Sequence, residues 1–161
     1  MTTMISRSRL RASVSGALLA LALSPALAQA AAPATSDAVA QVRTVAVRTA
    51  DEAVRWFEQH RGSSAYENLC ERAVRLAWDR STHHTDALDH WNSSDGTRHS
   101  GDTQPPRGAF VFWNTTGGHG HVGIADGEGG YWATNVRGAI GHFTSLSFFS
   151  NYLGWKAGDN N

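Results

Sequence analysis

The segment from residue 121 to residue 135 constrains the fold more than any other part of this chain. His121–Ala125 alternates like a strand, with Val122 and Ile124 on one face. Asp126–Gly130 is typical of a turn, and Tyr131–Asn135 has the composition of a returning strand. The chain is therefore expected to contain a β-hairpin at this point.

The length of the turn indicates how the two strands of this hairpin pair. The register that we prefer joins three pairs of residues: Ala125 with Tyr131, Gly123 with Ala133, and His121 with Asn135. Directly opposed side chains lie about 5 Å apart, so an Asn135 amide could hold the His121 imidazole. A slip of one residue would place Thr134 opposite His121 instead, and the pattern leaves both registers open.

The strand His121–Ala125 also has an unusual second face, formed by His121, Gly123 and Ala125. One large polar ring is followed there by two very small residues. We expect a helix to pack closely on this face, with the imidazole standing at its end.

The segments before and after the hairpin indicate further strands. Ala109–Trp113 is wholly apolar, as expected of a strand that is covered on both faces. Ala139–Phe143 is a candidate fourth strand, and one helical turn is expected over residues 86–91. These patterns predict a meander of neighbouring antiparallel strands.

Two capping patterns predict helices upstream of the strands. Thr49 and Glu52 have the spacing of a capping box, in which each side chain satisfies a backbone N–H of the other. Asn68 as N-cap, with Glu71 three residues later, would start a second helix and make Cys70 its second residue. Because helices precede strands, the predicted fold class is α+β, with N-terminal helices packed on an antiparallel sheet.

The beginning of the chain has the layout of a secretory signal peptide over residues 1–30. A basic start is followed by a short apolar run and by Ala28-Gln29-Ala30, a small-x-small cleavage pattern. Residues 31–50 form an Ala-rich spacer, and residues 51–157 form the expected domain. The apolar run is too short to span a bilayer, and no cysteine follows it that could carry a lipid. We therefore expect a secreted or periplasmic protein without a membrane anchor.

Charge excludes one class of partner. Removal of Arg7, Arg9 and Arg11 with the signal peptide leaves 11 of the 14 basic residues, against 14 acidic ones. Such a chain has no basic excess for binding nucleic acid.

Cys70 is the only cysteine in the chain, so it has no disulfide partner within it. The unpaired N–H groups at a helix start favour the thiolate, which predicts a lowered pKa for the Cys70 thiol. A nucleophile also needs a base and a group that orients the base, and His121 and Asn135 are the best candidates. Two other interpretations stay open: a small buried side chain, or half of an intermolecular disulfide.

The order of these segments resembles the papain-like cell-wall hydrolases of the NlpC type and the related cysteine/histidine-dependent amidohydrolase/peptidase domains. "PPRGAFVFW" is similar to the strand that precedes their histidine, and "GHVGIADGEGG" to the histidine strand and its turn. The small secreted members share further features, which are present here as Tyr66 with Cys70, Asp89 with Trp91-Asn92, Pro105-Pro106, and Tyr152-Leu153-Gly154-Trp155.

The resemblance implies a papain-like fold and hydrolysis of amide bonds in the stem peptides of bacterial peptidoglycan. It implies Cys70 as the nucleophile, His121 as the general base, and a polar third residue, for which Asn135 is our candidate. Tyr66 and Trp113 are candidates for walls of the substrate groove, and no cofactor is expected. NlpC-type enzymes usually show Asp-Cys-Ser-Gly, whereas Leu69 and Glu71 flank the cysteine here.

Two other functions are open at this stage. His119 and His121 lie on one side of a strand, a spacing that suits zinc, so a secreted zinc-dependent amidase or peptidase is one alternative. A non-catalytic cell-wall-binding module is the other, because six tryptophans could stack on sugars. The sequence does not identify the bond that is cleaved or whose wall is attacked. It also does not indicate a dedicated inhibitor or immunity protein, or the oligomeric state.

Overall fold

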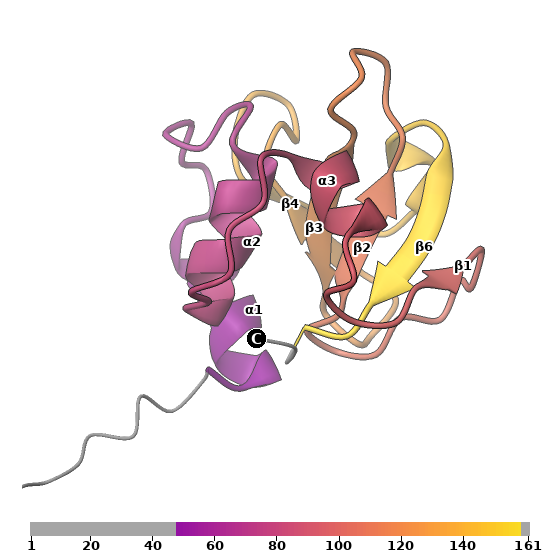
Figure 1. Cartoon of the computed structure of the whole chain (residues 1–161). Helices are drawn as coiled ribbons and strands as arrows, with labels where there is room; N and C mark the ends of the chain where they lie inside the picture. The colour runs from indigo at the N-terminus through magenta and orange to yellow at the C-terminus, as the bar shows by residue number, and fades with distance from the viewer. Residues whose placement is uncertain (1–47, 159–161) are drawn as a thin grey trace, which may run out of the picture. The chain divides into compact units, whose positions relative to one another are not determined.

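A computed structural model describes residues 48–158 of the chain (Figure 1). They belong to the second of the two units into which the chain divides, Val42–Asn161. The signal peptide predicted over residues 1–30, and the spacer predicted over residues 31–50 except for its last three residues, lie outside the described part.

Three α-helices and one short 3₁₀ helix are present among the described residues: α1 (Ala50–Gln59), α2 (Cys70–Trp78), α3 (Ala87–Asn92) and η1 (Leu146–Phe148). The capping box predicted at the start of α1 is confirmed, because the Thr49 side chain accepts from the Glu52 N–H and Glu52 accepts from the Thr49 N–H. The helical turn predicted near residue 86 is α3, whose N-cap is Asp86. Within residues 48–158, no helix has the length and apolar character needed to cross a membrane.

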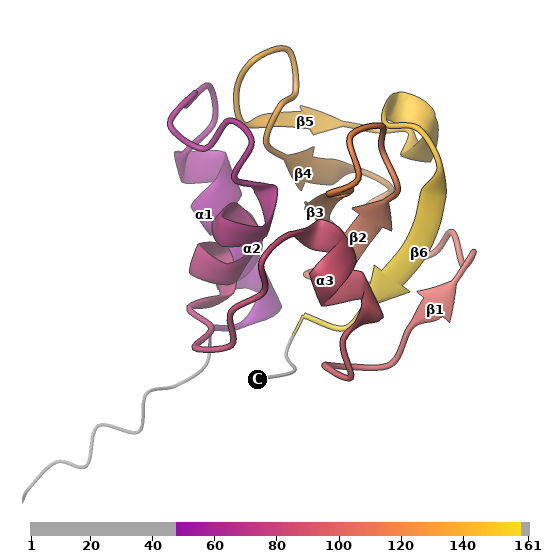
Figure 2. The same ribbon diagram turned by 45° about the horizontal axis from the view of Figure 1, so that its top comes forward.

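The described strands form one antiparallel sheet, in the order β1-β6-β2-β3-β4-β5. Their bounds are β1 (His99–Ser100), β2 (Phe110–Trp113), β3 (His121–Ala125), β4 (Tyr131–Ala133), β5 (Gly141–Phe143) and β6 (Tyr152–Lys156). The predicted meander corresponds to β2 through β5, while β1 and β6 were not anticipated. The predicted α+β class with helices on an antiparallel sheet is thus confirmed (Figure 2).

The preferred hairpin register is confirmed for two of its three pairs. Ala125 lies opposite Tyr131, and Gly123 lies opposite Ala133. The ladder ends there, because β4 stops at Ala133 and Asn135 adopts a left-handed backbone conformation with φ 58°. The expected third pair, His121 with Asn135, is therefore not part of the sheet.

Side chains of the sheet fill two separate cores, one on each face. Val122 and Ile124 pack in the first core, together with the buried faces of α1 and α2. Ala125 packs in the second core, which lies on the other face and contains Trp113 and Phe143. As predicted, the apolar strand β2 is buried along its whole length.

The expectation that a helix packs against Gly123 and Ala125 is wrong. The helices lie on the Val122 face instead, because the larger apolar side chains of the strand give them more area to bury. Gly123 is required by the neighbouring strand, since a Cβ there would lie 2.5 Å from the Trp132 carbonyl oxygen.

Candidate active site

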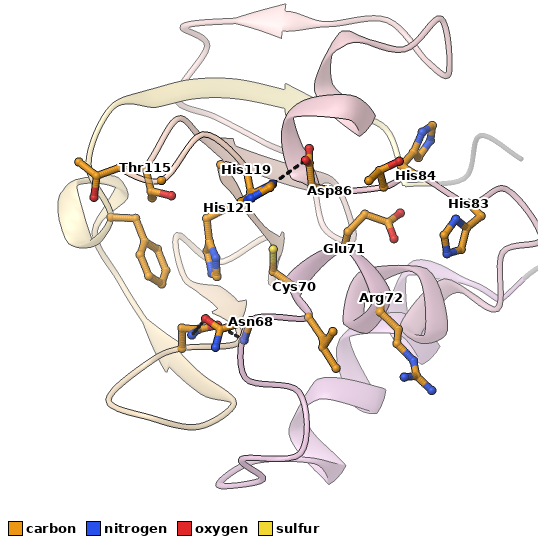
Figure 3. A pocket seen from close by; sticks show the side chains of 17 residues that line it. Asn68, Cys70, Glu71, Arg72, His83, His84, Asp86, Thr115, His119 and His121 are labelled. Atoms are coloured by element: carbon orange, nitrogen blue, oxygen red, sulfur yellow. Dashed lines mark hydrogen bonds and ion pairs between the residues drawn. The ribbon is translucent and has the colours of Figure 1, made fainter.

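Cys70 and His121 line the same cavity, which we call the Cys70 cavity and which has a volume of about 620 Å³. Three segments surround it, namely the start of α2, residues 83–86 and residues 115–121, together with two single residues from elsewhere, Asn135 and Phe149. Figure 3 shows the Cys70 thiol and the His121 imidazole directed toward the same part of this cavity. Residues far apart in the sequence thus meet at one place.

Cys70 is the first residue of α2, and Leu69 is its N-cap. The predicted capping by Asn68 and Glu71 is therefore wrong. Asn68 has a left-handed backbone with φ 61° and its side chain contacts Asn135 instead. Glu71 is only 5% exposed and lies toward the cavity rather than back over the helix end (Figure 3). The cysteine is nevertheless at the N-terminus of the helix, as expected.

The pKa of the Cys70 thiol is raised, contrary to the lowered value expected from the helix start. Burial is the largest cause, because it disfavours the charged thiolate. The backbone N–H groups of Val122 and Glu71 act in the opposite direction, and the nearby Glu71 carboxylate raises the pKa further. The resting form of the nucleophile candidate is therefore the neutral thiol.

His121 is also held in its neutral form. It is 7% exposed, and burial lowers the pKa of its imidazole to about 4. Its Nε2 atom lies 3.2 Å from the Thr134 carbonyl oxygen. Because a carbonyl can only accept, the proton of the neutral ring sits on Nε2, which leaves a lone pair on Nδ1. That second nitrogen is the one available as a base.

Two aromatic rings contact the His121 imidazole. Trp113 pairs with His121 across β2 and β3, and their ring centroids lie 6.3 Å apart. Phe149 lies closer, at 4.1 Å, and also lines the cavity. Sequence reasoning missed Phe149, because it follows η1 in a loop whose place beside β3 depends on tertiary packing alone. Its only local signal is the adjacent pair Phe148-Phe149 in a polar segment.

Asn135 lies at the cavity, but most of its hydrogen bonds are made with the segment before Cys70. Its Nδ2 atom donates to Glu67 Oε2 at 2.9 Å and to Asn68 Oδ1 at 3.2 Å. The acceptor within reach of His121 belongs to the preceding residue, Thr134. The structure therefore brings the predicted third residue close to the pair, while the contact with the imidazole is made by a neighbouring backbone carbonyl.

Trp113 and Tyr66, the two predicted groove residues, do not line the Cys70 cavity. Trp113 is fully buried in the second core, and its indole N–H donates to the Leu146 carbonyl at 2.7 Å. The indole is therefore enclosed by the second core and does not reach the Cys70 cavity, and a substrate contact at Trp113 stays a prediction. Tyr66 is half-buried and packs edge-on against Trp56 at a centroid distance of 5.2 Å.

The described residues contain one group with a possible metal-ligand arrangement, formed by His84, His90 and Asp95. His119 and His121, the predicted zinc pair, are not part of it. The Arg80 guanidinium already contacts His90 Nε2 at 3.3 Å and forms an ion pair with Asp95. The two imidazoles are also stacked, with ring planes only 14° apart, so their lone pairs do not converge on one point. The Arg80 guanidinium therefore occupies the position in which a metal ion would have to bind.

His119 is instead at the rim of the cavity. Its side chain is 79% exposed, and its Nδ1 lies 2.9 Å from Asp86 Oδ2. The next residue, Gly120, has φ +67°, and a Cβ there would lie 2.8 Å from Leu88. This close approach explains the glycine between the two histidines and lets residues 115–120 lie over α3.

Comparisons with known proteins agree on the fold. No protein-family model and no curated protein matches the chain in sequence. A solved NlpC/P60 family protein from Bacillus cereus matches in structure with a TM-score of 0.52 and 12% identity, over 70% of this chain and 41% of that one. The P60 domain of an antigen from M. avium subspecies paratuberculosis matches with a TM-score of 0.50 and 14% identity, over 70% of this chain and 96% of that one.

The chain has the NlpC/P60 fold. The described part accounts for less than half of the Bacillus cereus protein but for nearly all of the P60 domain. The peptidoglycan hydrolase RipB from Mycobacterium tuberculosis also matches, with a TM-score of 0.49 and 16% identity, over 65% of this chain and 63% of that one. The Bacillus cereus and M. avium matches confirm the predicted papain-like, NlpC-type architecture at the level of fold.

Proposed function

We propose that this protein is a cysteine hydrolase that cleaves an amide bond in the stem peptides of peptidoglycan. The observation that carries the proposal is the meeting of the only thiol of the chain with His121 in one cavity. The NlpC/P60 fold and the sequence resemblance to cell-wall hydrolases support the choice of substrate.

In the proposed mechanism, His121 activates the thiol only when substrate is present. Nδ1 of His121 takes the proton from Cys70 Sγ as the sulfur attacks the scissile carbonyl carbon. The backbone N–H of Cys70, at the start of α2, stabilises the developing oxyanion. The carbon–nitrogen bond then breaks, and the imidazolium gives its proton to the leaving amine.

The second half of the reaction releases the acid product. Water loses a proton to His121 Nδ1 and attacks the thioester carbon, and the carbon–sulfur bond breaks as Cys70 Sγ recovers the proton. Through both halves Nε2–H stays bonded to the Thr134 carbonyl, which keeps the ring oriented. The Thr134–Asn135 segment thus serves as the third member of the site. The Thr134 carbonyl contacts His121, and Asn135 is the next residue in the chain.

The proposed place of action is outside the cytoplasmic membrane of a bacterium, where peptidoglycan lies. The signal-peptide pattern of residues 1–30 supports export, and residues 51–157 would act as the mature domain. The raised pKa of the Cys70 thiol is compatible with the proposed mechanism, because the neutral His121, rather than a pre-formed thiolate–imidazolium ion pair, supplies the base.

Mass spectrometry of the products tests this function and names the bond. Purified peptidoglycan is incubated with the protein and with a Cys70→Ala variant, and the soluble fragments are identified. We expect new amine and carboxyl ends in the stem peptide with the wild-type protein and none with the variant. Wall binding without any released fragment would overturn the proposal in favour of a binding module.

A further inference from the structure

The loop that precedes Cys70 and the turn that supports His121 are joined by a compact set of hydrogen bonds. Glu67 accepts from two donors of Asn135: the backbone N–H at 3.0 Å and Nδ2 at 2.9 Å. Asn68 and Asn135 form a reciprocal pair, in which the Asn68 N–H donates to Asn135 Oδ1 at 3.1 Å and Asn135 Nδ2 donates to Asn68 Oδ1 at 3.2 Å. We call these three residues the Asn135 clamp.

Both ends of the clamp are next to the reacting groups. Asn68 stands two residues before Cys70, and Asn135 directly follows Thr134, whose carbonyl is in contact with His121 Nε2. The Thr134 hydroxyl also donates to Asn135 Oδ1, at 2.9 Å. A shift of this turn would therefore move the acceptor that fixes the His121 tautomer.

The backbone of the clamp is shaped for this contact. Asn68 and Asn135 both adopt left-handed conformations, with φ 61° and 58°, which asparagine tolerates better than most residues. The same loop is joined to the segment after β4 at a second point, where the Gly62 N–H donates to the Ile140 carbonyl and the Ile140 N–H to the Ser63 carbonyl. Figure 2 shows the α1–α2 loop beside the β4–β5 loop.

The clamp lies outside both hydrophobic cores. Glu67 is half-buried and Asn68 is exposed, while the buried apolar residues that hold α2 on the sheet do not depend on them. Loss of the clamp should therefore leave the fold in place. Catalysis is more sensitive, because a displacement of about 1 Å at reacting groups can lower a rate by on the order of 10²-fold.

We propose that Glu67 and Asn68 are positioning residues of this enzyme: through Asn135 they set the position of the Thr134 carbonyl, and thereby the tautomer and orientation of His121. This inference rests on the proposed function for its effect on turnover. The effect on the His121 tautomer does not depend on any substrate.

Glu67→Gln is the sharpest variant, because it keeps the size of the side chain but has one acceptor where the carboxylate has two. Its amide NH₂ must face a donor of Asn135, so one of the two hydrogen bonds is lost. Glu67→Ala removes both, and Glu58→Ala, at an exposed glutamate of α1, is the matched control.

The first measurement is steady-state turnover of soluble muropeptides. We expect kcat to fall by about 10-fold in Glu67→Gln and by up to about 10²-fold in Glu67→Ala, with KM within about 2-fold because Glu67, the residue that is changed, does not line the Cys70 cavity. Melting temperatures of all variants and the kcat of Glu58→Ala should stay at the wild-type values. A rise in KM at unchanged kcat, or full activity of Glu67→Ala, overturns the proposal.

The second measurement reads the His121 ring directly. Long-range ¹H–¹⁵N correlation spectra at pH 7 should show the Nε2–H tautomer in the wild-type protein and a mixture of tautomers in Glu67→Gln. An unchanged single tautomer in both Glu67 variants contradicts the positioning role. If the wild-type protein digests no peptidoglycan, the proposed function fails, and the tautomer result still decides for or against the clamp.

Discussion

Two histidines of this protein are kept neutral by burial, but only one of them can act as a base. The pKa of His121 is lowered to about 4 by burial alone, and the Thr134 carbonyl partly opposes that effect. The pKa of His90 is lowered to about 3, by burial and then by electrostatic interactions with His84, Arg80 and Lys156. We call Arg80, His84, His90 and Asp95 the Arg80 cluster.

The difference lies in what happens when an anion forms nearby. A thiolate or oxyanion beside His121 would raise the affinity of its Nδ1 for a proton, because a negative charge favours the imidazolium. Among residues 48–158, no charged side chain contributes to the pKa shift of His121. In the Arg80 cluster a cation is already present, because the Arg80 guanidinium forms an ion pair with Asp95. Under the proposed mechanism, burial of an imidazole therefore gives a base at His121 and a structural element at His90.

The largest expected effect is on activity, at the Cys70 cavity. We expect Cys70→Ala and His121→Ala each to lower wall digestion by at least about 10³-fold, because each removes a group that handles the proton or forms the covalent bond. Dye release from labelled peptidoglycan measures the loss, and circular dichroism checks the fold. His142→Ala, a histidine outside the cavity, is the control and should retain activity. Full activity of the Cys70→Ala or the His121→Ala variant would show that this thiol and this imidazole are not required for wall digestion.

The next effect is on stability, in the Arg80 cluster. Asp95→Asn leaves the buried Arg80 guanidinium without its carboxylate, which should cost on the order of 3 kcal/mol in the free energy of unfolding. Urea denaturation measures it, with the exposed Glu58→Gln expected to change stability by less than about 0.5 kcal/mol. Activity per folded molecule should not change. An Asp95→Asn protein as stable as wild type would show that the cluster does not depend on this pair.

Per pH unit, a smaller effect is expected from the pH dependence of stability. Both histidines take up protons in the unfolded chain near pH 6.5, but in the folded protein only near pH 4 for His121 and pH 3 for His90. Stability contributed by the neutral rings is thus fully present above pH 6.5 and is lost as the pH falls toward 4, by up to about 1.4 kcal/mol per pH unit for each ring. Glu71 acts in the opposite sense, because burial raises the pKa of its carboxyl.

Urea denaturation at several pH values between 7 and 4 checks this slope. His121→Ala should remove the part of this pH dependence that comes from protonation of His121 and leave the part that comes from His90. A free energy of unfolding that is flat from pH 7 to pH 5 would contradict the neutral state assigned to both rings.

The smallest expected effect is that of metal removal, which should be none. Because Arg80 takes the cationic place beside Asp95 and His90, EDTA should change neither wall digestion nor the melting temperature. Activity that EDTA abolishes and Zn²⁺ restores would favour the zinc-dependent alternative instead.

The sequence predicted those parts of the molecule in which local patterns determine the outcome. The turn Asp126–Gly130 indicated the hairpin and made the observed register the preferred one of two, and Thr49 with Glu52 indicated the start of α1. The alternation of small and large residues was misread at Gly123, because the neighbouring strand rather than a helix needs the space.

Two residues of the candidate site stood out from the sequence, but their contacts were not predictable. Cys70 and His121 stood out as a lone thiol and a strand-opening histidine, and both line one cavity. The raised thiol pKa depends on burial by distant segments, which no local pattern reports. Likewise, the contact of the Thr134 carbonyl with His121 follows from the early end of β4, and Glu67 and Phe149 reach the site through loops.

The most direct test of Cys70 as the nucleophile uses the wild-type protein, whose single cysteine makes labelling unambiguous. Aliquots are alkylated to different extents with iodoacetamide, the labelled fraction is read from the intact mass, and wall digestion is measured on each. If Cys70 is the nucleophile, activity should fall in proportion to the labelled fraction and reach zero at one adduct per chain. Fully labelled protein that digests peptidoglycan at the unlabelled rate would contradict it.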